Sequence, residues 1–479
     1  MYRKSLASAV TMFVLLSTLA LGNDSAANTG WKAGAAKTII TPEQPLWMAG
    51  YASRTRPGED KLTELWAKAL VLEGPDGHRG LVITLDLVGI DRTLAQAVCE
   101  ALHEHHDLQC EQIVICTSHT HSGPVVGHNL ESLHYRLLDE QQRQAIDTWT
   151  VKLQEQVLLV VGEAISKLAP SQLTWGSGQT MLAVNRRENP AALVSQSRTA
   201  GTLKGPSDYD VPVLAIRDAD QKLTAVLFGY ACHATTLSGD QWSGDYPGYA
   251  QIELEQTHPD CVALFFAGCG ADQNPLPRGT VEIAQHYGQR LATAVDEVLL
   301  TTQMQPVEGS LRTTYAEIDL PLDTLPTRAQ IESNKKSENR YEVARATMLL
   351  EQIDGGTPLS PSYPYPVSAW TIGDELQLVT LGGEVVVDYA IRLKSELAGT
   401  KTWVAGYAND VMAYIPSRRV LAEGGYEGGG AMVYYGLPSL WSPTIENDIV
   451  SEVHRQLTLL STQDSAAAAA QEAAVPSSK

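Results

Sequence analysis

The feature of this sequence that most constrains its fold is an apolar, β-branched run at residues 113–115 that leads directly into the segment CTSHTHSGP at 116–124. Such a run, ending in glycine and proline, is typical of a buried strand that leaves a sheet at its C-terminal end, where open α/β sheets carry their binding sites. Side chains alternate along an extended chain, so we expect His119 and His121 to point the same way. Two neighbouring imidazoles serve as two metal ligands, or as one ligand and a base. The alternative is a pair of core histidines that bond to backbone carbonyls.

Two later segments place further ligand types after an apolar run. Residues 223–231 lead into Cys232 and His233, and residues 375–381 lead through two glycines to Glu384. Two neutral imidazoles and a carboxylate suit Zn²⁺ and leave an open position for water. A cysteine zinc site is not expected, because none of the six cysteines stands in a C-x-x-C motif. The sequence does not choose among the 15 disulfide pairings that six cysteines allow.

Strand-like and helix-like segments alternate along the chain, which predicts an α/β fold. We expect one large catalytic domain at residues 31–463, built of mixed β-sheets flanked by helices, with its site at the C-terminal ends of strands. The main predicted strands are 65–72, 80–87, 113–115, 209–216, 223–231, 261–267, 375–381 and an edge strand at 309–320. The main predicted helices are 92–106, 146–168, 249–258, 280–300, 330–352, 385–397 and 445–460, with a loop rich in proline and tyrosine at 358–366.

Composition excludes one large class of partner. The chain has 35 basic and 55 acidic residues, a formal charge of -20 that repels phosphate backbones, so no nucleic-acid partner is expected. With 479 residues, of which 44% are hydrophobic, the chain can bury a substantial core. These values predict a globular protein.

The N-terminus begins with basic residues, continues with an apolar stretch at 6–21 and then turns small and polar. This order is typical of a secretory signal peptide, here residues 1–22, and the apolar stretch is shorter than the roughly 20 residues that span a bilayer. We expect a polar leader at 23–30 and a disordered, alanine-rich tail at 464–479. No later segment predicts a transmembrane helix. The protein is therefore predicted to be exported, to the periplasm or the extracellular space.

Three other enzyme classes fit the motifs poorly. Residues 268–270 read Gly-x-Gly after a predicted strand, but a dinucleotide loop would need a third glycine, and Pro275 and Pro277 block a tight helix start. A serine hydrolase of the α/β type needs a Gly-x-Ser-x-Gly turn, which the sequence lacks. The His-x-His motif of metallo-β-lactamases continues with Asp and His, whereas here Ser122 and Gly123 follow.

Taken together, the motifs resemble the neutral/alkaline, non-lysosomal ceramidases, a family of zinc amidases. Residues 117–124 are similar to the family signature THTHSGP, and the resemblance spans about residues 31–460. The other matching pieces follow in the family's order: Asn185-Arg186, Cys232-His233-Ala234-Thr235, Gly248-Tyr249-Ala250, Gly383-Glu384, Gly406-Tyr407-Ala408-Asn409, Tyr414 and Tyr426-Glu427-Gly428.

The resemblance implies a ligand set and a catalytic set. One Zn²⁺ would be held by His119, His233, Glu384 and Tyr414. His121 would transfer protons behind these ligands, and Arg186 and Tyr426 would face the substrate amide. In such a site zinc lowers the pKa of its water to about 7 and polarises the amide carbonyl. His121 can then pass a proton to the leaving amine, while Arg186 or Tyr426 stabilises the oxyanion.

The chain departs from the family pattern in two places. Residues 271–275 read ADQNP where the family has a serine proposed as a nucleophile, so we expect direct attack by metal-activated water. A short helix and the alanine-rich tail follow Gly436, so the family's separate immunoglobulin-like C-terminal domain is not expected.

These inferences predict an exported, zinc-dependent amidohydrolase. Its substrate would be a small-molecule or lipid N-acyl compound, either ceramide or a related molecule. One alternative is an exported metal-containing binding protein without catalysis, and another is a zinc esterase or hydrolase of a different substrate class. The oligomeric state does not follow from the sequence.

Overall fold

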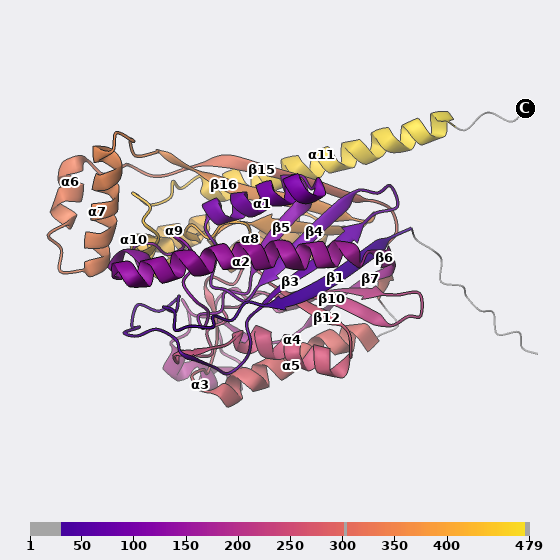
Figure 1. Cartoon of the computed structure of the whole chain (residues 1–479), viewed down its shortest axis with the longest axis horizontal. Helices are drawn as coiled ribbons and strands as arrows, with labels where there is room; N and C mark the ends of the chain where they lie inside the picture. The colour runs from indigo at the N-terminus through magenta and orange to yellow at the C-terminus, as the bar shows by residue number, and fades with distance from the viewer. Residues whose placement is uncertain (1–29, 301–303, 475–479) are drawn as a thin grey trace, which may run out of the picture.

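The structure, a computed structural model, describes residues 30–300 and 304–474. The predicted signal peptide and nearly all of the predicted leader lie outside these residues. Three β-sheets surround a shared core and carry helices on their outer faces, with α1, α2 and α11 on one side and α4 and α5 on the other (Figure 1). This arrangement confirms the predicted α/β class of mixed sheets flanked by helices.

The first sheet has the strand order β5-β4-β3-β1-β6. Its strands pair antiparallel except for β4 and β5, which are parallel and joined by helix α1. Helix α2 packs with α1 on the outer face, where both bury their apolar stripes. The bounds are β1 (Lys32–Ile39), β3 (Trp66–Glu73), β4 (Arg79–Leu85), β5 (Ile113–Thr117), β6 (Ala169–Pro170), α1 (Arg92–His106) and α2 (Glu140–Ser166).

The second sheet has the order β12-β10-β9-β7-β14 and again contains one parallel pair, β10 and β12, which helix α4 joins. Helices α4 and α5 pack together on its outer face. The bounds are β7 (Gln172–Gln179), β9 (Asp210–Arg217), β10 (Leu223–Tyr230), β12 (Val262–Ala267), β14 (Gln305–Pro306), α4 (Asp245–Thr257) and α5 (Val281–Leu300).

The third sheet has the order β15-β16-β17-β19, with β17 and β19 parallel and joined by helix α8. Helices α8 and α11 cover it. A hairpin of α6 and α7 stands apart at one end of the molecule (Figure 1). The bounds are β15 (Leu311–Pro321), β16 (Ser362–Ile372), β17 (Leu376–Leu381), β19 (Thr402–Ala405), α6 (Arg328–Asn334), α7 (Arg340–Asp354), α8 (Val387–Glu396) and α11 (Ile445–Ala474).

The remaining elements are short and lie in the loops between the sheets. Three two-stranded pairs are formed, β2 with β11, β8 with β13, and β18 with β20. The bounds are β2 (Asp60–Lys61), β8 (Ala183–Asn185), β11 (Gln241–Trp242), β13 (Gln273–Pro275), β18 (Glu384–Val385), β20 (Tyr414–Ile415), α3 (Val194–Thr199), α9 (Arg418–Glu423) and α10 (Met432–Tyr435).

The three sheets meet where β19 ends. Isolated bridges join Cys116 to Ala408 and Gly268 to Ala405, so the chain after β19 touches the ends of both β5 and β12. The core between the sheets contains the fully buried tryptophans Trp370 and Trp403. Because each sheet contributes a parallel β-α-β unit, strand ends from all three sheets point toward this junction.

Three segments differ from the predicted secondary structure. The predicted helix 330–352 is two helices, because Asn339 caps α7 by accepting a hydrogen bond from the Tyr341 amide. The predicted loop 358–366 contains the start of β16. Pro364 and Pro366 in this part of the strand pair with β15 alone, because the pairing with β17 begins at Val367. Proline is tolerated there because one side of the strand needs no backbone donor.

Within the predicted disordered tail, residues 464–474 continue helix α11, and residues 475–479 lie outside the described residues. Alanine has the highest intrinsic helix propensity, which favours continuing a helix already started at Ile445. Among the six cysteines the Sγ atoms of Cys99 and Cys110 lie 3.6 Å apart, and all six are free thiols in this structure.

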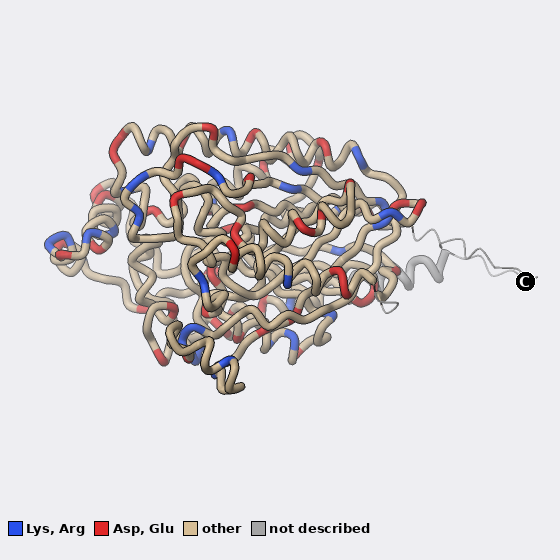
Figure 2. Tube along the Cα trace, turned by 90° about the horizontal axis from the view of Figure 1, so that it is seen from below, with Lys and Arg blue, Asp and Glu red and all other residues tan. Residues whose placement is uncertain are grey.

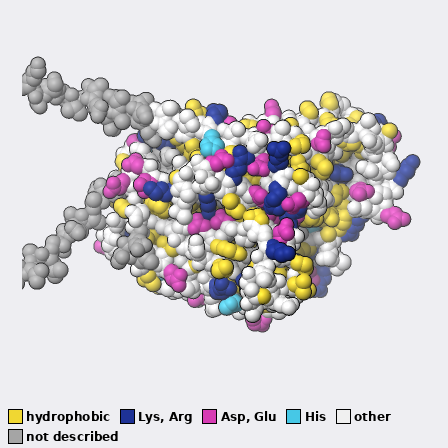
Figure 3. All heavy atoms as spheres, turned by 180° about the vertical axis from the view of Figure 1, so that it is seen from behind, with side chains coloured by type: hydrophobic (Ala, Val, Ile, Leu, Met, Phe, Trp, Pro, Cys, Tyr) yellow, Lys and Arg dark blue, Asp and Glu magenta, His cyan; other side chains and the backbone are white. Residues whose placement is uncertain are grey.

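Charged residues of both signs are spread along the trace without an extended basic stripe (Figure 2). On the rear face, hydrophobic side chains are interspersed with acidic and basic ones (Figure 3). Within the described residues, no helix combines the length and the apolar character that crossing a membrane requires.

Candidate metal centre

Three ligand-type side chains converge from the three sheets. His119 follows the end of β5, His233 follows the end of β10, and Glu384 follows the end of β17. The His119 and His233 ring centroids lie 4.7 Å apart, and each Nε2 atom lies 3.2 Å from Oε2 of Glu384. All three residues are buried, with at most 3% of their surface exposed. The geometric condition for a shared ion, rings closer than about 8 Å, is met.

Backbone carbonyls determine the tautomer of both histidines. Nδ1 of His119 donates to the Val88 carbonyl at 2.6 Å, and Nδ1 of His233 donates to the Gly270 carbonyl at 2.9 Å. Burial, aided by the nearby Arg186, lowers the pKa of His233 to about 4, so its ring is neutral at pH 7. With its one proton on Nδ1, the ring presents an Nε2 lone pair to Glu384.

The carboxylate oxygen at the centre of this group has no hydrogen-bond donor among the described residues. Buried lone pairs that face an anionic oxygen without protons between them are unfavourable, and a cation relieves this repulsion. Ligand bonds of 2.0–2.2 Å in a tetrahedral site separate neighbouring ligand atoms by about 3.3 Å, close to the observed 3.2 Å. The donor set therefore fits a small divalent metal.

Tyr414 lies at the fourth corner of this group. Glu384 in β18 and Tyr414 in β20 are direct register partners in a short parallel pairing, which brings the two side chains to the same place. The Tyr414 hydroxyl lies 3.3 Å from Nε2 of His233 and accepts a hydrogen bond from Nη2 of Arg186 at 3.1 Å. The Trp441 indole donates to the Tyr414 carbonyl at 2.8 Å and holds the strand in position.

His121 joins the group by a route that differs from the prediction. β5 ends at Thr117 and His119 has a left-handed backbone with φ of 59°, so the chain is not extended here. The two rings nevertheless meet, with Nε2 of His121 at 3.1 Å from Nε2 of His119. Such strained backbone positions cluster at functional sites. One ring nitrogen from each of His119, His121 and His233 lies within 4.8 Å of the other two.

Two neighbours hold His121 in this orientation. The buried Arg54 guanidinium donates to the His121 carbonyl at 2.6 Å, and the Tyr51 ring packs edge-on at 4.7 Å from the imidazole centroid. Nδ1 of His121 is buried and has no partner among the described residues. This atom is therefore free to carry a proton.

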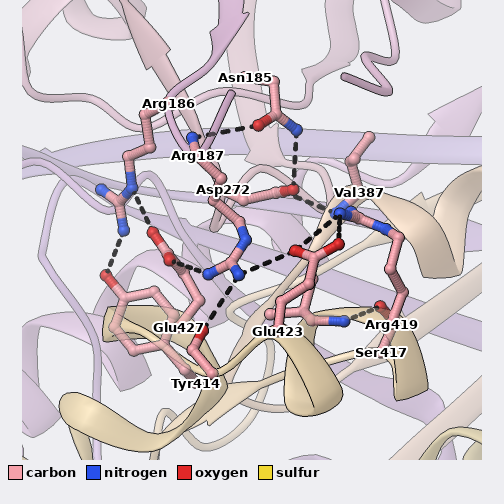
Figure 4. A network of polar contacts seen from close by, with 12 residues as sticks. Asn185, Arg186, Arg187, Asp272, Val387, Tyr414, Ser417, Arg419, Glu423 and Glu427 are labelled. Carbon is pink, nitrogen blue, oxygen red and sulfur yellow. Dashed lines mark hydrogen bonds and ion pairs between the residues drawn. The ribbon is translucent and has the colours of Figure 1, made fainter. Parts of the chain in front are cut away.

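A buried ion-pair network forms the wall beside Tyr414 (Figure 4). Arg186 donates from Nε to Glu427 at 2.7 Å, and Arg187 donates from Nη1 to the other oxygen of Glu427 at 2.7 Å. Arg187 also pairs with Glu423 at 2.9 Å. Arg186 and Arg187 therefore connect the end of β8 to the glycine-rich loop around Tyr426, and their charges are paired with carboxylates.

Sequence reasoning missed Tyr435, whose hydroxyl donates a short hydrogen bond to Oε1 of Glu384. Tyr435 ends helix α10, 51 residues after its partner. No sequence motif indicates that Tyr435 contacts Glu384, because this contact depends on how the short helix α10 packs. Glu427 was noticed as part of the Tyr-Glu-Gly motif, and its pairing with both arginines was not predicted.

The segment with glutamine in place of the family serine has a structural role. Gln273 is buried, and its side-chain Nε2 donates to the Ala231 carbonyl at 2.8 Å. Its backbone carbonyl accepts a hydrogen bond from the His233 amide at 3.0 Å. These bonds hold the segment that carries His233. Gln273 does not line the cavity described next.

A cavity of about 610 Å³ opens over the histidines. The predicted residues that line it are His121, His233, Arg186, Tyr414 and Tyr426, whereas His119 and Glu384 do not line it. Tyr426 is 48% exposed, and its ring lies 5.3 Å from the Tyr414 ring. The cavity thus joins the ligand group to solvent.

Comparison with known proteins places this geometry in a family. A sequence profile described as neutral/alkaline non-lysosomal ceramidase, N-terminal, matches residues 31–270, just over half of the chain. The neutral ceramidase of Pseudomonas aeruginosa is 24% identical over 84% of this chain and 69% of its own length. A neutral ceramidase of Drosophila pseudoobscura pseudoobscura is 24% identical over 65% of this chain and 51% of its own length. The chain therefore spans between about half and two thirds of these relatives.

Solved structures share the fold. The crystal structure of neutral ceramidase from Pseudomonas aeruginosa matches with a TM-score of 0.68 and 22% identity, covering 88% of this chain and 73% of that one. A structure described as ceramidase complexed with C2 gives the same TM-score at 19% identity, over 88% of this chain and 74% of that one. From the profile match and the shared fold, we conclude that this chain belongs to the neutral/alkaline non-lysosomal ceramidase family.

Proposed function

We propose that this protein is an exported, zinc-dependent amidohydrolase that cleaves the amide bond of an N-acyl substrate, ceramide or a related compound. One observation carries the proposal. The unprotonated Nε2 atom of His233, together with Nε2 of His119, faces a donorless oxygen of Glu384 beside a solvent-connected cavity. The names of the relatives support amide hydrolysis, and the basic and apolar N-terminus supports export.

The proposed ligands are His119, His233, Glu384 and Tyr414. A zinc ion held by these residues would polarise the substrate carbonyl and activate a water molecule for attack. The Val88 and Gly270 carbonyls keep the two imidazoles turned so that Nε2 faces inward. Arg186 keeps the Tyr414 oxygen directed toward His233.

His121 is the proposed proton-transfer residue. Burial, together with the neighbouring His119 and His233, holds the pKa of His121 well below its usual range, so the ring is neutral at pH 7 and can accept a proton. It can accept the proton of the attacking water and deliver it to the leaving amine. The acyl carbon gains the water oxygen, the C–N bond breaks, and the products are a carboxylic acid and an amine.

Arg186 and Tyr426 are proposed to face the substrate amide from the cavity wall. The guanidinium is shared with Glu427, Tyr414 and Asn274, which limits its movement. The Tyr426 hydroxyl is the more available donor for the developing oxyanion, because the side chain is half exposed and its ring adjoins Tyr414.

Metal analysis combined with an amide-hydrolysis assay tests this function. We expect the purified protein to contain about one zinc per chain, and we expect chelation to abolish hydrolysis of N-acyl substrates until zinc is restored. The control is a zinc-reconstituted sample that regains activity. Bound zinc without turnover of any amide or ester would instead favour a binding protein, and turnover of esters alone would favour an esterase.

Tyr435→Phe is expected to weaken zinc binding by about 10- to 100-fold, because it removes the hydroxyl that orients Glu384 through Oε1. Competition with a calibrated chelator measures the affinity. Tyr434→Phe is the matched control, since its neighbouring ring packs at 6.2 Å from Tyr426 and does not touch Glu384. Equal affinities in the two variants would exclude an orienting role for Tyr435.

A further inference from the structure

Most side chains that line the cavity over the histidines carry a polar or charged group, and the tyrosine rings supply apolar surface. Its residues are glycines, tyrosines, histidines, a threonine, an asparagine, arginines and glutamates, with no aliphatic, phenylalanine, tryptophan or methionine side chain among them. A ceramide carries two long hydrocarbon chains, which gain about 25 cal/mol for each Å² of surface that leaves water for an apolar wall. This wall offers mainly hydrogen-bond donors and acceptors in place of such a surface.

Six charged residues line the cavity, and four of them neutralise one another. Arg186 and Arg187 pair with Glu423 and Glu427, as described above. The other two, Glu188 and Arg278, line the cavity as solvent-exposed side chains and form no ion pair within the described part of the chain. The wall therefore keeps two charges for a bound molecule.

Arg278 lies close to the proposed ligands. Its Nη1 atom donates to the Thr235 carbonyl at 3.3 Å, two residues beyond His233. Tyr51 lines the same cavity as Arg278. Arginine has five N–H donors in a planar fork, so one bond to a carbonyl leaves the others free to bind a carboxylate.

We propose that the site takes a polar N-acyl compound with one carboxylate, an N-acyl amino acid in the simplest case, and that Arg278 binds that carboxylate. This inference rests on the proposed amidohydrolase function. Hydrolysis consumes one water, breaks the amide C–N bond, and releases a carboxylic acid and an amino acid. Because Glu188 also lines the wall, a single negative charge is favoured over several.

A panel of substrates tests the proposed substrate class, N-acyl compounds with one carboxylate. The probes are N-butanoyl amino acids, their uncharged carboxamides, and N-acetylsphingosine in detergent micelles. We expect kcat/KM at least about 10-fold higher for the carboxylates than for the carboxamides or the ceramide. A higher value for N-acetylsphingosine would overturn the substrate class and leave the amidohydrolase function intact. Turnover of none of the three by the zinc-loaded protein would instead overturn the proposed function.

A matched pair of variants tests Arg278 itself. Arg278→Gln should raise KM for the carboxylates by about 10- to 100-fold and leave KM for the carboxamides unchanged. Arg217→Gln is the control, because Arg217 also donates from Nη1 to a backbone carbonyl, at 3.2 Å, and lies outside the cavity wall. An Arg278→Gln variant that shifts both substrate types equally, or neither, would contradict carboxylate binding.

Discussion

His119→Ala and His233→Ala are each expected to lose the bound zinc and to reduce kcat/KM for amide hydrolysis by about 10³-fold or more. Each substitution removes one Nε2 ligand, and the metal supplies several kcal/mol of transition-state stabilisation, where every 1.4 kcal/mol is a factor of about ten. Glu384→Gln should have a similar effect with less change of shape, because it removes the charge and keeps a group of the same size. Zinc content by atomic spectroscopy, measured with the rate, reports the two effects separately.

A remote histidine provides the control for this prediction. His258 pairs with Asp296 at 2.7 Å, well away from the cavity wall, and His258→Ala should retain zinc and activity. Circular dichroism on every variant shows whether the fold survives. Full zinc occupancy and full activity in both His119→Ala and His233→Ala would exclude a metal shared by the two rings.

His121→Ala is expected to keep zinc and to lower kcat by about 10²- to 10⁴-fold, the range for a removed general acid or base. KM should change little, because the imidazole is proposed to act on protons and not on substrate affinity. Zinc titration and steady-state kinetics on the same preparation measure both properties. His121→Gln, which restores some polar volume without the imidazole, separates loss of chemistry from loss of packing.

The result for His121→Ala also shows whether His121 is a proton-transfer residue or a third imidazole ligand of the metal. Its Nε2 atom lies 3.1 Å from Nε2 of His119, close enough for a third imidazole ligand. Loss of zinc in His121→Ala would identify it as a ligand, and unchanged turnover with zinc retained would remove it from proton transfer.

Local patterns were sufficient for most of the fold and for the placement of His119, His233 and Glu384 at strand ends. The apolar runs before His119, His233 and Glu384 are strands, and each ligand-type residue follows a strand end, as expected. Hydrophobic periodicity and turn residues act over a few positions, so a single sequence contains them in full. The Pro364 and Pro366 segment was mispredicted because strand pairing on one side only makes proline acceptable, and pairing is not a local property.

By itself the sequence determined most of the elements that form and which residue types stand at the ends of its strands. Tertiary structure alone decided that the three sheets meet at one junction, that the His119 backbone is left-handed, and that Tyr435 reaches Glu384. It also decided that mostly polar residues line the cavity, and that the exposed Arg278 lines it without an ion-pair partner among the described residues. These contacts join residues 43 to 292 positions apart, so they depend on how whole sheets and helices pack. Packing free energy is shared among many side chains, and no short motif encodes it.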